Sequence, residues 1–121
     1  MTRNSFLARR AASFGFAMKG ILVLFTTQFH AWVHLVATLV VVGAATCLSV
    51  TATEWGLLVL AIGLVWVAEA INTAVEFVVD LASPEHHELA GKAKDCAAGA
   101  VLLAAITAAC IGALVFVPKL M

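Results

Sequence analysis

The chain has 121 residues, of which 64% are hydrophobic and 12% are charged, and its formal net charge at pH 7 is +0. Soluble domains contain roughly 45–50% apolar and 25% charged residues, so this chain has too little polar surface to cover a water-soluble fold. The balanced charge gives no indication of a nucleic-acid partner. We therefore expect one small membrane domain that covers residues 1–121.

The N-terminal segment mixes aromatic residues with cations and contains no long apolar core. A cleaved signal peptide is therefore not expected. From about residue 5 to 25, phenylalanines and leucines alternate with Arg9, Arg10 and Lys19. This mixture predicts an amphipathic helix that lies in the membrane interface with its apolar side towards the lipid.

Three apolar stretches follow, each long enough to cross a bilayer as a helix. They predict an all-α membrane protein with three transmembrane helices, at about residues 31–50, 55–81 and 96–117. Thr51–Glu54 is expected to form a short turn between the first two spans. Ser83 is expected to cap a short helical stretch with Pro84 in its first position, before a polar loop that reaches Asp95.

The cysteines and the cations each add one expectation. Cys47, Cys96 and Cys110 lack metal-ligand spacing and are interpreted as small buried apolar residues. Six of the seven cations precede the first span or lie between the second and third, and only Lys119 lies on the other side. This bias predicts a cytoplasmic N-terminus in a multi-pass protein of the membrane.

Polar residues recur along one face of the second span. Glu69, Asn72, Glu76 and Asp80 have helical directions within about 80° of one another, and the axial rise from the first to the last is about 16 Å. Ionisable groups inside a membrane normally mark function. Such oxygen ligands can hold Mg²⁺, and a buried carboxylate can act as a general base on an alcohol. Asp80 by itself is equally consistent with an interfacial residue.

The following loop and the start of the third span carry further polar groups. Lys94 would place a cation beside the acidic face, where it would either contact phosphate or extend to the interface with a charge partner. His86 and His87 are adjacent in the loop and are expected to face solvent rather than to bind a metal. The chain has no glycine-rich phosphate loop of the kind found in soluble kinases.

Two long motifs carry a resemblance to a known family. Residues 69–80 read EAINTAVEFVVD, and residues 85–101 read EHHELAGKAKDCAAGAV. Together with the three-span layout, this sequence resembles the small bacterial diacylglycerol kinase and undecaprenol kinase family over nearly the whole chain. The resemblance implies a homotrimeric integral membrane lipid kinase of the bacterial cytoplasmic (inner) membrane, with active sites shared between subunits. It implies ATP as the phosphate donor, Mg²⁺ as cofactor and a membrane lipid alcohol as substrate.

The resemblance also implies roles for individual residues. Glu69 would be the general base, with Asn72 placing substrate or base, and Glu76 would bind Mg²⁺ with Gln28 beside it. The residues implied to contact the nucleotide are Arg9, Phe16, Glu76, Glu85, His86, His87, Lys94 and Asp95. The residues implied to contact the lipid substrate are Glu69, His30, His34 and Ala98.

Three positions depart from the pattern of some members. Gln28 stands where some carry a metal-binding glutamate, Phe16 where some carry a tyrosine, and His30 where asparagine is frequent. Two other classes remain open from the residues alone. An intramembrane acid also fits a small proton- or cation-coupled transporter, and the neutral Gln28 fits a catalytically inactive family member. The lipid that is phosphorylated, diacylglycerol or undecaprenol, is not distinguished by the sequence.

Overall fold

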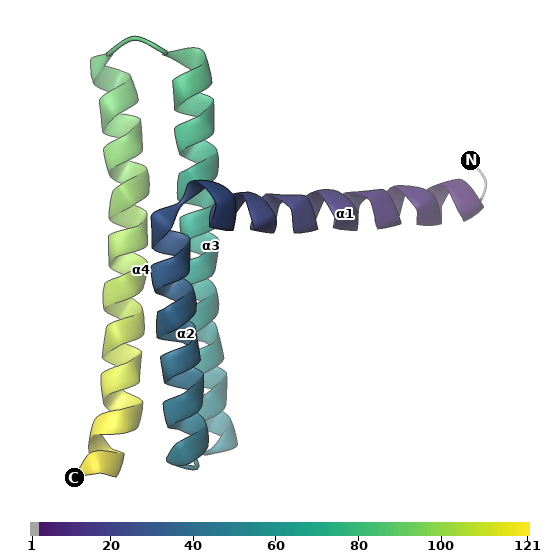
Figure 1. Ribbon diagram of the computed structural model, residues 1–121. Helices are drawn as coiled ribbons and strands as arrows, with labels where there is room; N and C mark the ends of the chain where they lie inside the picture. Colours follow the sequence, from purple (N-terminus) through teal and green to yellow (C-terminus); the bar gives the residue numbers. More distant parts are fainter. Residues whose placement is uncertain (1–2) are drawn as a thin grey trace.

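The computed structural model describes residues 3–121, and this part of the chain is all-helical. Its helices are α1 (Arg3–Thr27), α2 (Phe29–Cys47), α3 (Ala52–Ala82) and α4 (Glu88–Leu120). The first of these projects sideways from a bundle formed by the other three (Figure 1). Helices α2, α3 and α4 are each long and apolar enough to cross a membrane. The predicted fold class, an N-terminal helix followed by three spans, is therefore confirmed.

The chain turns from α1 into α2 at a single residue, Gln28. Its backbone is extended, with φ −119° and ψ 116°. Its N–H donates to the carbonyl of Leu24 at 3.0 Å, and its own carbonyl accepts from the N–H of Ala31 at 3.3 Å. These two hydrogen bonds end α1 and begin α2 without a loop between them. The Gln28 side chain is therefore held at the corner of the bundle.

Helix α2 ends at Cys47, three residues before the predicted boundary. Ser49 adopts the left-handed conformation with φ 52°. The N–H of Val50 donates to the carbonyl of Ala45 at 3.3 Å, and that of Ser49 donates to the carbonyl of Thr46 at 3.4 Å. This pair of bonds is a Schellman motif, which satisfies the last carbonyls of a helix. Ala45 and Val50 are both buried in the apolar cluster at this end of the bundle.

The predicted turn over Thr51–Glu54 is wrong, because these residues begin α3 instead. The Thr51 hydroxyl accepts from the Glu54 N–H at 3.2 Å, and the Glu54 carboxylate accepts from the Thr51 N–H at 3.0 Å. This reciprocal capping box satisfies two donors that a helix N-terminus leaves free. Glu54 also pairs with Lys119 at 3.0 Å and so links the start of α3 to the end of α4.

The predicted helical start at Ser83 and Pro84 is also wrong. Ser83 ends α3, since its N–H donates to the carbonyl of Val79 at 2.8 Å. Its hydroxyl donates to the carbonyl of Glu85 at 2.9 Å and closes the bend that follows. A serine hydroxyl can satisfy either a turn or a helix N-terminus, and here the turn is formed.

Helix α4 begins earlier than predicted, at Glu88 rather than at Cys96. His87 caps it, because its Nδ1 accepts from the Leu89 N–H at 3.1 Å. An ion pair between Lys92 and Glu88 at 3.2 Å, with the spacing of one helical turn, supports the first turns. The polar residues up to Asp95 are therefore helical and not a loop.

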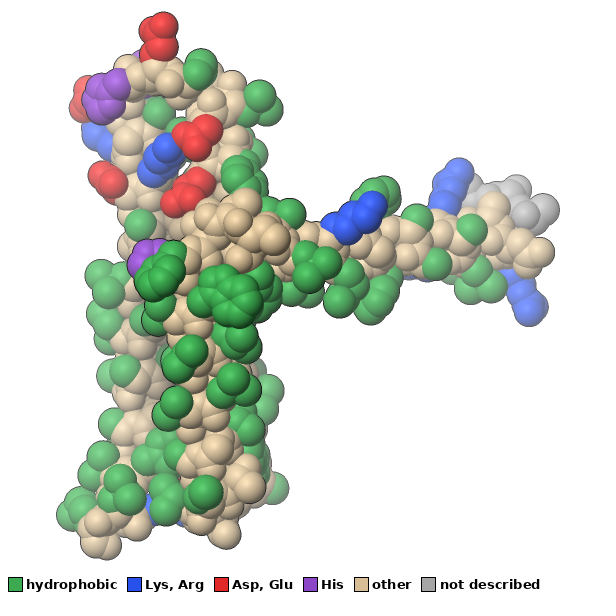
Figure 2. Space-filling view, viewed as in Figure 1, with side chains coloured by type: hydrophobic (Ala, Val, Ile, Leu, Met, Phe, Trp, Pro, Cys, Tyr) green, Lys and Arg blue, Asp and Glu red, His purple; other side chains and the backbone are tan. Residues whose placement is uncertain are grey.

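The two long helices exceed the thickness of a bilayer. Helix α3 has 31 residues and α4 has 33, which correspond to about 46 Å and 50 Å against a hydrocarbon core of about 30 Å. Acidic, histidine and lysine side chains gather on the end of these helices that lies beyond α1 (Figure 2). We call the segment from Glu76 to Lys94 the polar end. Hydrophobic side chains cover most of the remaining bundle surface in this view.

The three cysteines are exposed in this chain, so their interpretation as buried residues is wrong. A bundle of three spans has little interior, and the buried apolar positions are mostly small or lie at the far end. Side chains on the outer faces of the helices face whatever surrounds the bundle. The apolar character of a span residue therefore does not by itself place that residue inside the protein.

Candidate functional site

The polar face predicted on α3 exists and is graded from buried to exposed. Glu69 is 2% exposed and Asn72 is 8% exposed. Glu76 is half-buried, and the side chain of Asp80 is 63% exposed. This order follows the helix towards the polar end, as the spacing predicted. The deepest carboxylate is therefore the one with the least access to water.

Glu69 is held by a residue of α2. Its Oε2 lies 3.2 Å from Nε2 of His34, whose side chain is 16% exposed. The other carboxylate oxygen, Oε1, is buried and has no hydrogen-bond partner among residues 3–121. Buried polar oxygens are normally paired, so an unpaired carboxylate oxygen is a place where a donor is expected. Glu69 can accept a hydrogen bond there without releasing His34.

Asn72 presents a second buried oxygen without a partner, its Oδ1. It lies one helical turn from Glu69 and borders a cavity of about 380 Å³ between α3 and α4. Small residues of α4, including Ala97, Ala100 and Ala104, form the opposite wall. The two unpaired oxygens thus lie on adjacent sides of α3.

Two residues to which the sequence assigned no functional role support this site. Trp66 donates from Nε1 to the Thr38 hydroxyl at 3.0 Å, and its ring meets that of His34 edge-to-face at 6.1 Å. Thr38 in turn donates to the carbonyl of His34 at 2.7 Å. Trp66 precedes Glu69 by three residues and Thr38 follows His34 by four, so helical spacing was the signal that could have found both.

The predicted metal pair, Gln28 and Glu76, is brought together. The Gln28 side-chain amide donates from Nε2 to Oε2 of Glu76 at 3.4 Å. Among residues 3–121, no group of three or more His, Cys, Asp or Glu side chains could hold a metal ion. Mg²⁺ commonly uses one or two carboxylates together with water and substrate phosphates. The pair therefore fits an Mg²⁺ ion that arrives with a nucleotide, and it does not fit a metal held by the protein alone.

Asp80 contacts α4 rather than α2. Its carboxylate pairs with the ammonium of Lys94, and both side chains are substantially exposed. Glu69 pairs with a residue of α2 but Asp80 pairs with one of α4, because α2 begins only at Phe29, next to the corner residue Gln28. Beyond that level α4 is the neighbour that runs beside α3 (Figure 1). The predicted cation beside the acidic face is therefore present.

The polar end encloses a hollow of about 170 Å³. Charged and imidazole groups from α3, the connecting bend and α4 line it, namely Asp80, Glu85, His86, His87 and Lys94. Four of these belong to the predicted nucleotide-binding set. His86 and His87 are exposed, as expected. Asp95, the neighbour of Lys94, is exposed and does not line this hollow.

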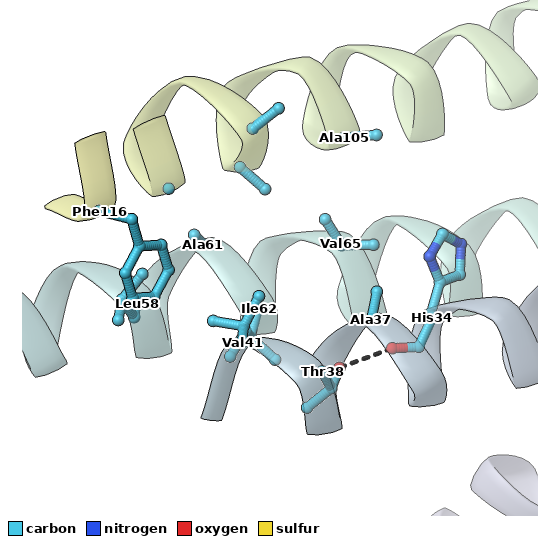
Figure 3. A pocket seen from close by; sticks show the side chains of 13 residues that line it. His34, Ala37, Thr38, Val41, Leu58, Ala61, Ile62, Val65, Ala105 and Phe116 are labelled. Carbon is cyan, nitrogen blue, oxygen red and sulfur yellow. Dashed lines mark hydrogen bonds between the residues drawn. The ribbon is translucent and has the colours of Figure 1, made fainter. Parts of the chain in front are cut away.

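An apolar cavity of about 300 Å³ lies on the other side of His34 from the polar end. It is enclosed by α2, α3 and α4 and lined mainly by alanine and aliphatic side chains. Figure 3 shows His34 at one end of it and Leu58 with Phe116 at the other. A polar group thus stands at the head of a long apolar space.

The remaining predicted residues lie apart from this site in the single chain. Arg9 and Phe16 are exposed on α1, which extends away from the bundle (Figure 1). His30 is exposed in the first turn of α2, and Ala98 is exposed on α4. None of the four lines the apolar cavity or the hollow at the polar end. Their roles stay predictions.

The fold and this site define the class: a small multi-pass helical membrane protein with a buried carboxylate between an apolar cavity and a charged end. A family model described as prokaryotic diacylglycerol kinase matches residues 15–116. The chain belongs to the prokaryotic diacylglycerol kinase family, which is a family of lipid kinases.

Individual relatives carry two activities in their names. The chain is 39% identical over 114 residues to an undecaprenol kinase of Bacillus subtilis, covering 94% of this chain and 93% of that protein. It is 44% identical over 110 residues to a diacylglycerol kinase of Synechocystis, covering 90% of this chain but only 63% of that protein. A diacylglycerol kinase of Escherichia coli is 38% identical over 94 residues, covering 78% of this chain and 77% of that protein.

Proposed function

We propose that the protein is an ATP- and Mg²⁺-dependent kinase that transfers the γ-phosphate to the hydroxyl of a membrane lipid, either undecaprenol or diacylglycerol. The observation that carries this proposal is Glu69. It is a carboxylate buried in a transmembrane helix, with one oxygen held by His34 and the other without a partner. A carboxylate at this depth costs on the order of 3 kcal/mol to insert, so it is retained for a purpose.

Glu69 would act as the general base. A lipid hydroxyl that reaches Oε1 would donate its hydrogen bond there and pass its proton to the carboxylate as its oxygen attacks the γ-phosphorus. The bond between that phosphorus and the β,γ-bridging oxygen breaks, and ADP leaves. Such a base contributes about 10²–10⁴-fold to a rate. Asn72, one turn further along, would help to place the substrate or the base.

The nucleotide would occupy the polar end. Phosphoryl transfer depends mainly on positioning and on neutralising the charge of the phosphates. Lys94 and the imidazoles of His86 and His87 line the hollow there with Glu85. Glu76, with Gln28 beside it, would hold Mg²⁺, which when bound would neutralise charge on the β- and γ-phosphates. Asp95 would contact the nucleotide from α4.

The lipid would lie along the bundle with its hydroxyl near Glu69. The apolar cavity that begins at His34 has the shape that an amphiphile requires, a polar head position followed by an apolar lining. His30 and Ala98, which are exposed to the surroundings of the bundle, would contact the lipid from outside. An apolar wall discriminates poorly between chains, since one methylene is worth about 1–3 kcal/mol, so both lipid alcohols fit this geometry.

The proposal includes a homotrimer in the bacterial inner membrane, with the N-terminus and the polar end in the cytoplasm. Six of the seven cations lie in α1 or near the start of α4, which favours that side as the inner one. Arg9 and Phe16 lie on α1, away from the polar end of their own chain. A nucleotide site that includes them would therefore take them from a neighbouring subunit.

The test is Mg-ATP-dependent phosphorylation of diacylglycerol and undecaprenol, assayed side by side in mixed micelles. We expect turnover of at least one lipid, and we expect Glu69→Gln to reduce it by about 10²–10⁴-fold because the amide cannot take the proton. Phosphorylation of neither lipid by the wild type would contradict the proposed activity. Unchanged turnover in Glu69→Gln would contradict the assigned base.

A further inference from the structure

We infer that His34 is a positioning residue for Glu69: its imidazole holds one carboxylate oxygen so that the other faces the acceptor hydroxyl. This inference rests on the proposed function. It differs from the role predicted for His34 in the sequence, which was contact with the lipid.

The proposed role of Glu69 as a base assigns the direction of the hydrogen bond. An ionised carboxylate accepts hydrogen bonds and cannot donate, so a general base that is ready to react must receive its bond from the imidazole. The 3.2 Å contact therefore requires a proton on Nε2 of His34. Oε1 remains without a partner. The two oxygens of one carboxylate thus have different tasks, because one is occupied and the other is available.

His34 is itself held in place from two directions. Its carbonyl accepts from Thr38, whose hydroxyl receives the hydrogen bond of Trp66. The Trp66 ring also meets the imidazole edge-to-face. Trp66 and Glu69 belong to α3, so these contacts fix the histidine of α2 against the helix that carries the base. An imidazole that contacts both the Trp66 ring and the Glu69 carboxylate can set the angle of that carboxylate.

His34 also lies where a lipid substrate would approach Glu69. The residue lines the apolar cavity, at the end opposite Leu58 and Phe116 (Figure 3). A lipid chain in that cavity would bring its hydroxyl past the imidazole on the way to Oε1. Loss of the imidazole would let the Glu69 carboxylate rotate. A misplaced base slows the reaction of a bound substrate more than it weakens the binding of that substrate.

The first experiment separates rate from binding. We expect His34→Leu to lower kcat about 10–100-fold while KM for ATP stays within about twofold, as for loss of a group that orients a catalytic residue. His34→Gln keeps a donor and should recover most of kcat. Leu39→Phe, on the exposed side of α2, is the control for an apolar change in that helix. If His34→Leu does not fold, His34→Ala tests the same donor.

The second experiment reads Glu69 without turnover. Dicyclohexylcarbodiimide modifies protonated carboxyl groups in apolar surroundings. The hydrogen bond from His34 occupies Oε2, so its loss would leave both oxygens of Glu69 without a partner and free to react with the reagent. We expect labelling of Glu69 to be several-fold faster in His34→Leu than in the wild type, with His34→Gln between them. Glu69→Gln identifies the labelled site by losing the signal.

Three kinetic results would overturn the inference. They are a folded His34→Leu with wild-type kcat, a His34→Gln as impaired as His34→Leu, and a defect confined to KM for the lipid. Equal labelling in wild type and His34→Leu would also overturn it. The proposed function fails separately, because a wild type that phosphorylates neither lipid removes the activity while the labelling still reports on the His34–Glu69 contact.

Discussion

Two of the residue pairs that join α3 to its neighbours differ in almost every respect. Glu69 meets His34 of α2 in the interior, where the carboxylate is 2% exposed. Asp80 meets Lys94 of α4 at the polar end, where their side chains are 63% and 42% exposed. The inner pair is largely buried and is held by the Trp66 ring, whereas the outer pair borders the hollow at the polar end.

The buried pair is suited to catalysis and the exposed pair to ligand binding. A buried carboxylate with one fixed oxygen has a defined orientation before any ligand arrives, which suits a base. Exposed ion pairs contribute little to stability because water and salt screen them. Lys94 can therefore exchange Asp80 for a phosphate at small cost. We expect substitutions in the interior to change the rate, and substitutions at the polar end to change ligand binding.

The largest effect that sharpens this comparison is expected at Glu76, which lies between the two regions. Glu76→Gln removes a charged oxygen ligand, and we expect Mg²⁺ affinity to fall about 10–100-fold, measured as a rise in the Mg²⁺ concentration for half-maximal turnover. Excess Mg²⁺ should restore much of the activity. Glu88→Gln is the matched control, since Glu88 pairs with Lys92 of its own helix. An unchanged Mg²⁺ requirement in Glu76→Gln would remove this residue from the metal site.

A smaller effect is expected at Lys94. Lys94→Met removes the cation from the hollow, and we expect KM for ATP to rise about tenfold while kcat changes less than threefold, the loss of one charge-assisted contact. Steady-state kinetics at fixed Mg²⁺ measure both constants. Lys92→Met removes a cation two residues away that does not line the hollow. A fall in kcat with constant KM in Lys94→Met would place this lysine in the chemical step. It would contradict the assignment of ligand binding to the polar end and of the rate to the interior.

The smallest effect is expected at Gln28. Gln28→Glu replaces the neutral partner of Glu76 with a second carboxylate, and two carboxylates bind Mg²⁺ better than one. We expect the Mg²⁺ concentration for half-maximal turnover to fall about threefold. Thr27→Glu adds the same charge one residue earlier, on the exposed end of α1, and should leave this concentration unchanged. A higher Mg²⁺ requirement in Gln28→Glu would show that repulsion between the carboxylates outweighs coordination.

Much of the site could be predicted because helical spacing alone brings residues of one helix to one face. Glu69, Asn72, Glu76 and Asp80 needed no other information to be grouped. Apart from the interpretation of the three cysteines, the errors arose at helix ends, where one local hydrogen bond decides the boundary. The Thr51–Glu54 pattern is readable as a capping box, but Ser83 could serve a turn or a cap, and His87 is an uncommon N-cap.

The sequence by itself determined the three spans, the N-terminal helix and the acidic face, since these follow from apolar length and from a fixed angle per residue. The tertiary structure decided which oxygen of Glu69 is occupied, because the His34 contact joins residues 35 positions apart. It also decided that Gln28 faces Glu76 and that Asp80 turns to Lys94. Such pairings depend on the position along α3 at which α2 begins, and the periodicity of a single helix does not encode that position.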